Sequence, residues 1–189
     1  MALKGHSIPN TIMHQEPEGI GDQQLIDGFL RHRSERDFRL LYRRYAVSIH
    51  RLALHLLNYE QAAADDVAQE TWITAMKKLD TFQGTSSFRT WLTGILLFKV
   101  KEHQKSALRK PRVALEMDTA QPLSGYPGIG IDLQRGLASL SAGYHQVLVL
   151  HDSEGYTHEE IATLLGISEG TSKSQLFHAR RQVQKFLNR

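Results

Sequence analysis

The chain has 189 residues, of which 41% are hydrophobic, 23% charged and 8% aromatic, and it contains no cysteine. This length and apolar content suit one large or two small domains, and the lack of cysteine excludes a disulfide scaffold, a thiolate metal site and a cysteine nucleophile. The 23 Lys and Arg against 20 Asp and Glu give a formal net charge of +3, which by itself favours no class of partner.

The beginning of the chain shows no signal for export or membrane insertion. Residues 1–21 are rich in Gly, Pro, Asn, Gln and His and are predicted to form a flexible tail. They lack the apolar segment of a signal peptide, and no apolar run in the chain approaches the ~20 residues of a membrane-spanning helix. We therefore expect a cytoplasmic protein without membrane insertion.

Residues 22–106 are predicted to form an all-helical bundle. A short helix is expected to begin with Asp22 as its N-cap, and a long helix with Ser34 as its N-cap and Asp37 completing a start like a capping box. Apolar residues at steps of three and four then give the long helix one buried stripe, which ends before Asn58: Phe38, Leu41, Tyr42, Tyr45, Ile49, Leu52, Ala53 and Leu56. Further helices are predicted over residues 60–79 and from residue 88 onward, with a break at 82–87.

Residues 107–131 contain the prolines and closely spaced glycines of a flexible linker, long enough to let the two halves sit apart. Residues 132–189 return to helix. Thr157 is a predicted N-cap with Glu160 at the reciprocal position, Gly166 lies at a turn, and Ser168 begins a second helix. The predicted fold is therefore all-α, with two small helical domains joined by a linker, the second of them a helix-turn-helix.

Two segments are strongly basic. Residues 98–112 hold six Lys or Arg and one Glu, and residues 170–189 hold five Lys or Arg and no acid. Such segments are typical of polyanion binders, although a solvated helix face has the same composition. If the second helix binds DNA, its cations contact phosphates, and Lys173, Ser174, Gln175 and His178 carry groups that match base edges.

An acidic cluster on the helix predicted over residues 60–79 can be interpreted in three ways. Asp65, Asp66, Gln69 and Glu70 share one helix surface, which fits paired catalytic or metal-binding carboxylates, a docking face for a basic partner, or a solvated face. The sequence offers no second set of ligands, no metal-binding His spacing among its ten histidines, no phosphate loop and no nucleophile elbow. We therefore expect a binding protein with no catalytic residues, metal or cofactor.

The segment around residue 88 is also ambiguous. Phe82, Phe88 and Trp91 fit the core of a bundle, but next to a polar loop and a basic helix they also fit a site that captures unstacked bases.

Together, the two halves resemble bacterial sigma-70-family sigma factors of the extracytoplasmic-function (ECF) type, which keep only regions 2 and 4. Residues 37–45, 64–72 and 87–95 are similar to region 2, and residues 137–141 and 154–180 to region 4. The resemblance covers residues 22–187 and implies region 2 over 22–106, a linker over 107–131 and region 4 over 132–189. It also implies a transcription initiation factor that binds core RNA polymerase and directs it to promoters.

The resemblance assigns roles to individual residues. Asp65, Asp66, Gln69 and Glu70 would dock on the clamp helices of the largest polymerase subunit, and region 4 would contact the polymerase flap. The melted non-template strand of the −10 element would be held by Phe82, Gln83, Gly84, Ser86, Ser87, Phe88, Arg89, Trp91 and Lys99. The −35 duplex would be read by Thr157, Lys173, Ser174, Gln175, Phe177, His178 and Arg181. Many members of the family are also held by an anti-sigma factor.

The chain departs from the family pattern at several positions. Phe98, Glu102 and Lys105 stand where Asn, Asp and Arg are usual, and Ser172 stands where an apolar residue is usual. Gln175 and His178 replace common arginines, which implies fewer phosphate or guanine contacts at the −35 element. The alternatives are a helix-turn-helix regulator that acts without polymerase, and a helical adaptor.

Overall fold

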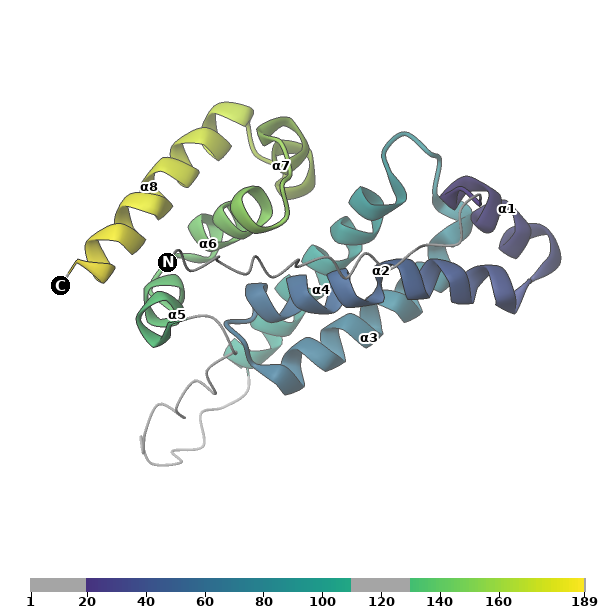
Figure 1. Cartoon of the computed structure of the whole chain (residues 1–189), viewed down its shortest axis with the longest axis horizontal. Helices are drawn as coiled ribbons and strands as arrows, with labels where there is room; N and C mark the ends of the chain where they lie inside the picture. Colours follow the sequence, from purple (N-terminus) through teal and green to yellow (C-terminus); the bar gives the residue numbers. More distant parts are fainter. Residues whose placement is uncertain (1–19, 110–129, 189) are drawn as a thin grey trace, which may run out of the picture.

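The computed structural model describes residues 20–109 and 130–188, and its regular elements within these ranges are all helical (Figure 1). The first half comprises α1 (Asp22–His32), α2 (Glu35–Leu56), α3 (Gln61–Lys78), the 3₁₀ turn η1 (Leu79–Thr81) and α4 (Phe88–Arg109). The second half comprises α5 (Ile131–Ala138), α6 (Ala142–Leu148), the π-helical turn η2 (Val149–Ser153), α7 (His158–Leu165) and α8 (Glu169–Leu187). The predicted all-α class is confirmed. In the described ranges no helix is both long and apolar enough to cross a membrane.

The start of α1 differs from the prediction by one residue. Gly21 is the N-cap and Asp22 is the first helical residue. The Asp22 carboxylate instead accepts hydrogen bonds from Arg44 and Tyr45 on α2, so it fixes the two helices to each other rather than capping one. Ser34 does cap α2, because its hydroxyl accepts a hydrogen bond from the Asp37 amide.

Helices α2, α3 and α4 enclose the core of the first half. Leu41, Leu52, Leu92 and Leu96 are fully buried there, and each contributes about 1.5–3 kcal/mol through burial. The predicted stripe on α2 faces the core, although Phe38 and Tyr45 are only partly buried. Tyr42 is the exception, since it remains 45% exposed. Its ring packs beside that of Trp72 at the edge between α2 and α3, with centroids 4.9 Å apart, rather than entering the core.

Helix α4 is longer than predicted. It continues to Arg109, so residues 107–109, assigned to the linker from the sequence, are helical. At the other end of the predicted linker, Gly130 is the N-cap of α5 and Ile131 is its first residue. Residues 110–129 of the predicted linker and most of the predicted N-terminal tail lie outside the described residues.

The helix-turn-helix forms as predicted. Thr157 and Glu160 make a reciprocal capping box at the start of α7. Gly166 ends that helix with a φ of +66°, a left-handed conformation that favours glycine, and the Ser168 hydroxyl caps α8. The capping box, the glycine turn and the serine cap thus fix where α7 begins, where it ends and where α8 begins.

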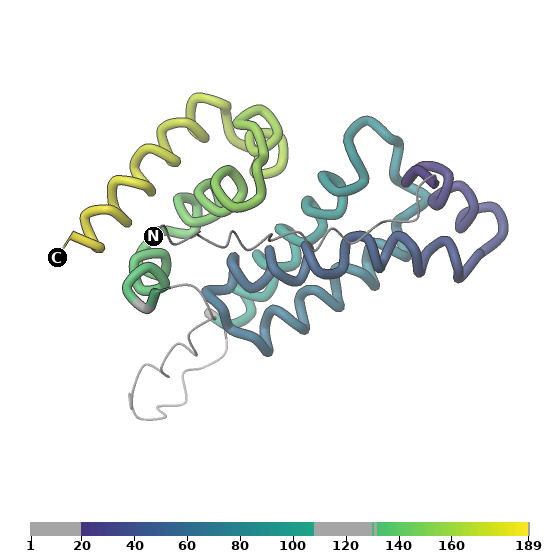
Figure 2. The backbone as a smooth tube through the Cα atoms, in the orientation of Figure 1, coloured from purple at the N-terminus to yellow at the C-terminus, as the bar shows by residue number. Residues whose placement is uncertain are grey.

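The two halves are in contact in this structure. Helices α5–α8 gather at one end of the α2–α4 bundle, and α1 lies at the other (Figure 2). Helix α7 packs against α4, and η2 packs against α2. The linker length allows separation, but here the halves share an interface.

Candidate functional site

The predicted docking residues occupy one exposed face of α3. Asp65, Asp66, Gln69 and Glu70 all face solvent, while the intervening Val67 and Ala68 are buried. Asp65 is also bound within the chain: its Oδ1 lies 2.6 Å from His50 Nε2 and accepts a 2.9 Å hydrogen bond from Gln61 Nε2. The shared face predicted from the sequence is therefore present, with Asp65 held by neighbours and Asp66 directed to solvent.

A groove of about 600 Å³ between α2 and α3 lies beside this face. Asp65 and Gln69 belong to its lining, together with apolar side chains that water reaches. Val47 is the most exposed of these, at 77%, and Tyr42 and Ile73 are also exposed. Val47 and Ile73 were not among the site residues predicted from the sequence. Val47 could have been found from the sequence, because it is an apolar residue on the α2 helix that falls outside the buried stripe. Such a residue indicates an exposed apolar surface.

Lys99 connects two of the predicted sites. Its Nζ lies 2.9 Å from Glu102 Oε2 and 3.6 Å from Glu70 Oε2, so α3 and α4 are linked by charge at this point. The hydrogen bond to Glu102 raises the pKa of Lys99 above its ordinary value. Two acids therefore already neutralise this cation.

The loop before α4 presents polar groups to solvent. Gln83, Gly84, Ser86 and Ser87 are exposed, and Gly84 has a φ of +69°. The Ser87 hydroxyl accepts a 3.1 Å hydrogen bond from the Thr90 amide, so it caps α4. The loop is thus fixed at both of its ends by helices, with its middle free to contact a ligand.

Aromatic rings pack beneath this loop. Phe82 and Trp91 are partly exposed, with ring centroids 5.5 Å apart. Phe88 is only 3% exposed and packs against Tyr45, Phe82 and Trp91. Of the two roles that the sequence allowed for Phe88, the structure therefore shows the core residue. Phe88 supports the neighbouring rings and has no exposed ring face on which a base could stack.

Arg89 points from the start of α4 toward the second half. One of its guanidinium nitrogens donates to the Glu154 carboxylate at 2.9 Å and to the Glu154 carbonyl oxygen at 3.0 Å. A residue predicted to contact DNA therefore has a partner inside the chain, and sequence analysis missed Glu154 because the two residues are 65 positions apart.

Helix α8 exposes most of the predicted duplex-reading residues. Lys173, Ser174, Phe177, His178 and Arg181 are exposed. Several have local partners: Lys173 pairs with Glu169 at 2.6 Å, the Ser174 hydroxyl donates to the Thr171 carbonyl at 3.0 Å, and the His178 ring stacks on Tyr144.

Two predicted residues have other contacts. Gln175 is half-buried and its amide lies next to Gly143 on α6, so it does not face solvent fully. Thr157 uses its hydroxyl in the α7 capping box.

Ser172 is an unusual residue in the interior of the helix-turn-helix. It is fully buried, and its hydroxyl oxygen lies 2.9 Å from His158 Nδ1 on α7. Burial, and then the neighbouring His151, lower the pKa of His158. The polar residue at this position, unusual for the family, therefore has a hydrogen-bonding partner across the helix pair.

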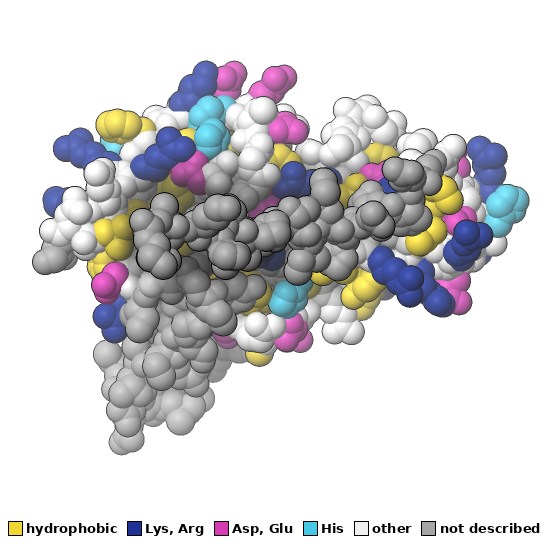
Figure 3. Space-filling model, viewed as in Figure 1, with side chains coloured by type: hydrophobic (Ala, Val, Ile, Leu, Met, Phe, Trp, Pro, Cys, Tyr) yellow, Lys and Arg dark blue, Asp and Glu magenta, His cyan; other side chains and the backbone are white. Residues whose placement is uncertain are grey.

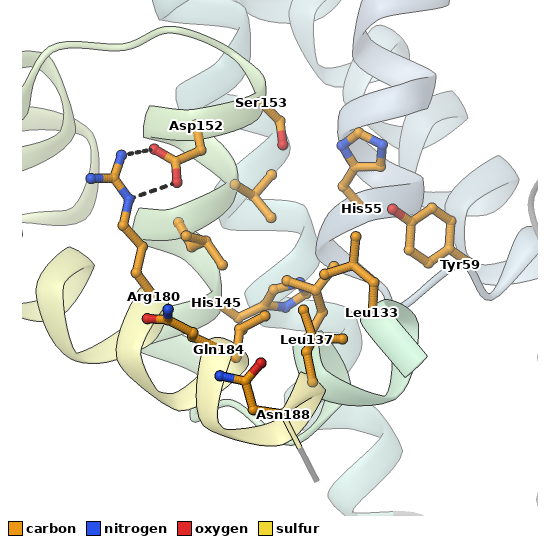
Figure 4. Close-up of a pocket in the computed structure, with 14 residues that line it drawn as sticks. His55, Tyr59, Leu133, Leu137, His145, Asp152, Ser153, Arg180, Gln184 and Asn188 are labelled. Carbon is orange, nitrogen blue, oxygen red and sulfur yellow. Dashed lines mark hydrogen bonds and ion pairs between the residues drawn. The ribbon is translucent and has the colours of Figure 1, made fainter. Parts of the chain in front are cut away.

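The basic character of α8 is partly compensated elsewhere. Arg180 Nε donates to Asp152 Oδ2 at 2.9 Å, which joins α8 to η2 (Figure 4). In the space-filling view, Lys and Arg side chains lie over α8 at one end and around α1 at the other, and acidic side chains lie among them at both ends (Figure 3). Within the described residues there is no group of three or more His, Asp or Glu able to hold a metal ion.

Comparison with known proteins places this arrangement in a family. Residues 41–110 match the family described as Sigma-70 region 2, and residues 131–183 match the family described as Sigma-70, region 4. The RNA polymerase sigma-H factor of Pseudomonas aeruginosa is 30% identical over 185 residues, spanning 88% of this chain and 93% of that protein. The ECF RNA polymerase sigma factor SigE of Mycolicibacterium smegmatis is 28% identical over 182 residues, spanning 90% of this chain but 65% of that protein.

A solved structure supports the same assignment. The sigma factor RpoE, in complex with the anti-sigma factor NepR from Bartonella quintana, matches 81% of this chain and 98% of its own, with a TM-score of 0.69 and 25% identity. These similarities show that the chain belongs to the sigma-70 family of RNA polymerase sigma factors, of the ECF type. The chain is thus a transcription initiation factor, and core RNA polymerase and promoter DNA are its partners.

Proposed function

We propose that this chain docks on core RNA polymerase through the exposed face of α3 and the adjoining α2–α3 groove. The observation that carries the proposal is an exposed apolar groove that contains Val47 and is lined by Gln69, next to the exposed Asp66 on α3. Stable protein interfaces combine an apolar centre with a polar rim, and an acidic rim fits a basic partner helix. Glu70 contributes less to docking than Asp66, because Lys99 already pairs with it.

The docking proposal is tested by a charge placed in the groove. We expect Val47→Asp to weaken binding to bacterial core polymerase at least tenfold, because the carboxylate must lose water in an apolar contact. Asp66→Ala and Gln69→Ala should each weaken binding by a smaller factor. The matched control is Asp132→Ala, which removes an exposed carboxylate from α5. Affinities measured by fluorescence anisotropy that are the same for Val47→Asp and the control would refute the docking face.

We also propose that the loop before α4 holds the melted −10 strand. Exposed amide and hydroxyl groups of Gln83, Ser86 and Ser87 can hydrogen-bond an unstacked base, and the partly exposed Phe82 and Trp91 can stack on one. Arg89 would contact the strand once it leaves Glu154, while Phe88 would act by supporting the rings.

Helix α8 is proposed to read the −35 duplex from the major groove. Lys173 and Arg181 supply phosphate contacts, and Ser174, Phe177 and His178 face the side that would meet bases. Since Gln175 is half-buried, and Gln175 and His178 stand where arginines are common, we expect few phosphate contacts and a shallow salt dependence for this element. Footprints of the polymerase complex on promoter DNA should lose upstream protection in Lys173→Ala while the melted region is retained.

Two further assignments belong to this proposal. An anti-sigma factor is a proposed partner, because RpoE, a similar sigma factor, was solved with NepR. We assign the chain a cytoplasmic, binding role without catalysis, in which the energy for strand opening comes from contacts with polymerase and DNA.

A further inference from the structure

A groove of about 510 Å³ lies between the start of α7 and α8. Lys173, Phe177 and Arg181, which are proposed to contact the −35 duplex, belong to its lining, and so does His158, the first residue of α7. In helix-turn-helix proteins the first helix crosses the DNA backbone while the second reads the major groove. His158 therefore lies where a phosphate of the bound duplex would pass, although it is not among the residues predicted from the sequence to bind DNA.

Two contacts hold the His158 ring in place. Its Nδ1 lies 2.9 Å from the hydroxyl oxygen of Ser172, which is fully buried, and its ring stacks on His151 with the centroids 4.7 Å apart. A hydroxyl can donate to a neutral imidazole nitrogen and can accept from a protonated one. Ser172 therefore serves both protonation states of His158. Because Ser172 engages Nδ1, a ligand of His158 would bind at Nε2.

The acids around His158 are already paired with cations. Helix α4 meets α7 at Leu164, in the last turn of α7, whereas the charged groups around His158 come from η2 and α8. They are His151 and Asp152 on η2, and Glu169, Lys173 and Arg180 on α8. Arg180 Nε donates to Asp152 Oδ2 at 2.9 Å, and Lys173 Nζ lies 2.6 Å from Glu169 Oε1. A proton on His158 would therefore be compensated best by an anion from outside the chain.

We propose that His158 contacts a phosphate of the −35 duplex and takes up a proton when it does so. In the complex, the Nε2–H group of the protonated ring donates to a phosphate oxygen, and the Nδ1–H group donates to Ser172. The −35 contact then depends on pH through a residue of α7, beside the phosphate contacts of Lys173 and Arg181 on α8. This inference rests on the proposed role of α8 and adds to it one further contact residue and one proton.

The direction of the pH dependence follows from the protons bound before and after the contact. In the free chain, burial and then the neighbouring His151 hold the pKa of His158 below its ordinary value of 6.5, so the ring is neutral at pH 7.5. A phosphate beside Nε2 favours the charged form and raises this pKa. Between the two pKa values the complex holds more protons than the free chain, so the affinity for DNA increases as pH falls. One proton limits the change to about tenfold per pH unit.

The contact is tested with the full chain by NMR titration, which also detects weak binding. A short DNA duplex of mixed sequence is added at low salt, with EDTA present, at pH 6 and at pH 7.5, since phosphate contacts do not depend on sequence. We expect the ratio of the two affinities to be about four times larger in the wild type than in His158→Gln. His32→Gln removes an exposed histidine from the last turn of α1, and as the matched control it should behave like the wild type.

Ser172→Ala is a second variant, which keeps the histidine. It removes the acceptor for Nδ1–H at a buried position, so we expect a smaller affinity ratio than in the wild type. Equal ratios in the wild type, His158→Gln and His32→Gln would overturn the proposal, as would a His158 ring whose pKa is unchanged by the duplex. The absence of duplex binding at both pH values would also overturn it.

Binding of core polymerase and protection of the upstream duplex are measured separately. If the affinity ratio falls in His158→Gln but the chain forms no complex with polymerase, the proton-coupled contact stands and the proposed function fails. If the polymerase complex protects the upstream duplex and the ratio does not change in His158→Gln, the proposed function stands and the proton-coupled contact fails.

Discussion

A buried histidine makes the stability of the protein depend on pH in a way that can be calculated. His145 on α6 is 6% exposed and lies with His55 of α2 on the wall of an apolar cavity of about 530 Å³ between the halves (Figure 4). Burial, and then the charge of His55, lower the pKa of His145 from 6.5 to about 4. The pKa of His55 is also lowered, chiefly by burial.

The direction in which stability changes with pH follows from where His145 takes up its proton in the folded and unfolded chain. In the unfolded chain His145 takes up a proton near pH 6.5, whereas in the folded chain it does so only near pH 4. Between these values the unfolded state binds more protons, so the free energy of unfolding decreases as pH falls. The stabilisation is fully present above pH 6.5. At pH 5 the loss from this one group is about 2 kcal/mol, and it approaches about 3 kcal/mol below pH 4.

The prediction is tested by urea unfolding of the wild-type chain and His145→Leu at pH 7 and pH 5, followed by circular dichroism. We expect the wild type to lose about 2 kcal/mol more than His145→Leu between the two pH values, because leucine does not titrate. His32→Gln, at an exposed position, is the control and should behave like the wild type. An equal loss in all three proteins would refute the reasoning.

Three further predictions concern local structure. Thr157→Ala should lower the free energy of unfolding by about 1 kcal/mol because α7 loses its cap, whereas Thr157→Ser should restore it; equal values in urea titrations would contradict the capping role. Replacing Ser172 and His158 by alanine, singly and together, should reveal a coupling free energy of about 1 kcal/mol, and additive effects would show that their contact is not stabilising. Gly84→Ala should lower the melting temperature, since the φ of +69° costs alanine about 1 kcal/mol; an unchanged melting temperature would exclude that strain.

Features set by neighbouring residues could be predicted from the sequence. The caps at Ser34 and Thr157 and the turn at Gly166 each depend on residues within one helical turn, and all form as expected. Ser168, predicted as the first residue of the second helix, is its N-cap, one position before the helix begins. The common face of Asp65 and Gln69 follows in the same way from helical spacing.

Features set by the contact between distant segments could not be predicted. In the sequence, Arg180 is only one of five basic residues in a segment without acids, because its partner Asp152 lies 28 positions earlier and is brought close by the folding of the second half. Asp is a residue type that often caps helices, but the Asp22 carboxylate accepts hydrogen bonds from Arg44 and Tyr45 on α2 instead. Glu154 gave no signal at all, because its burial requires both halves of the chain to meet.

The central claim is that this chain directs core polymerase to promoters. The most direct test is transcription of genomic DNA fragments from the source organism by bacterial core polymerase with and without the purified chain, with the 5′ ends of the transcripts sequenced. We predict transcripts with defined 5′ ends only when both proteins are present, and their loss with Val47→Asp. The absence of defined transcripts and of a complex on gel filtration, together with tight binding of duplex DNA by the chain alone, would contradict the account and favour a regulator that acts without polymerase.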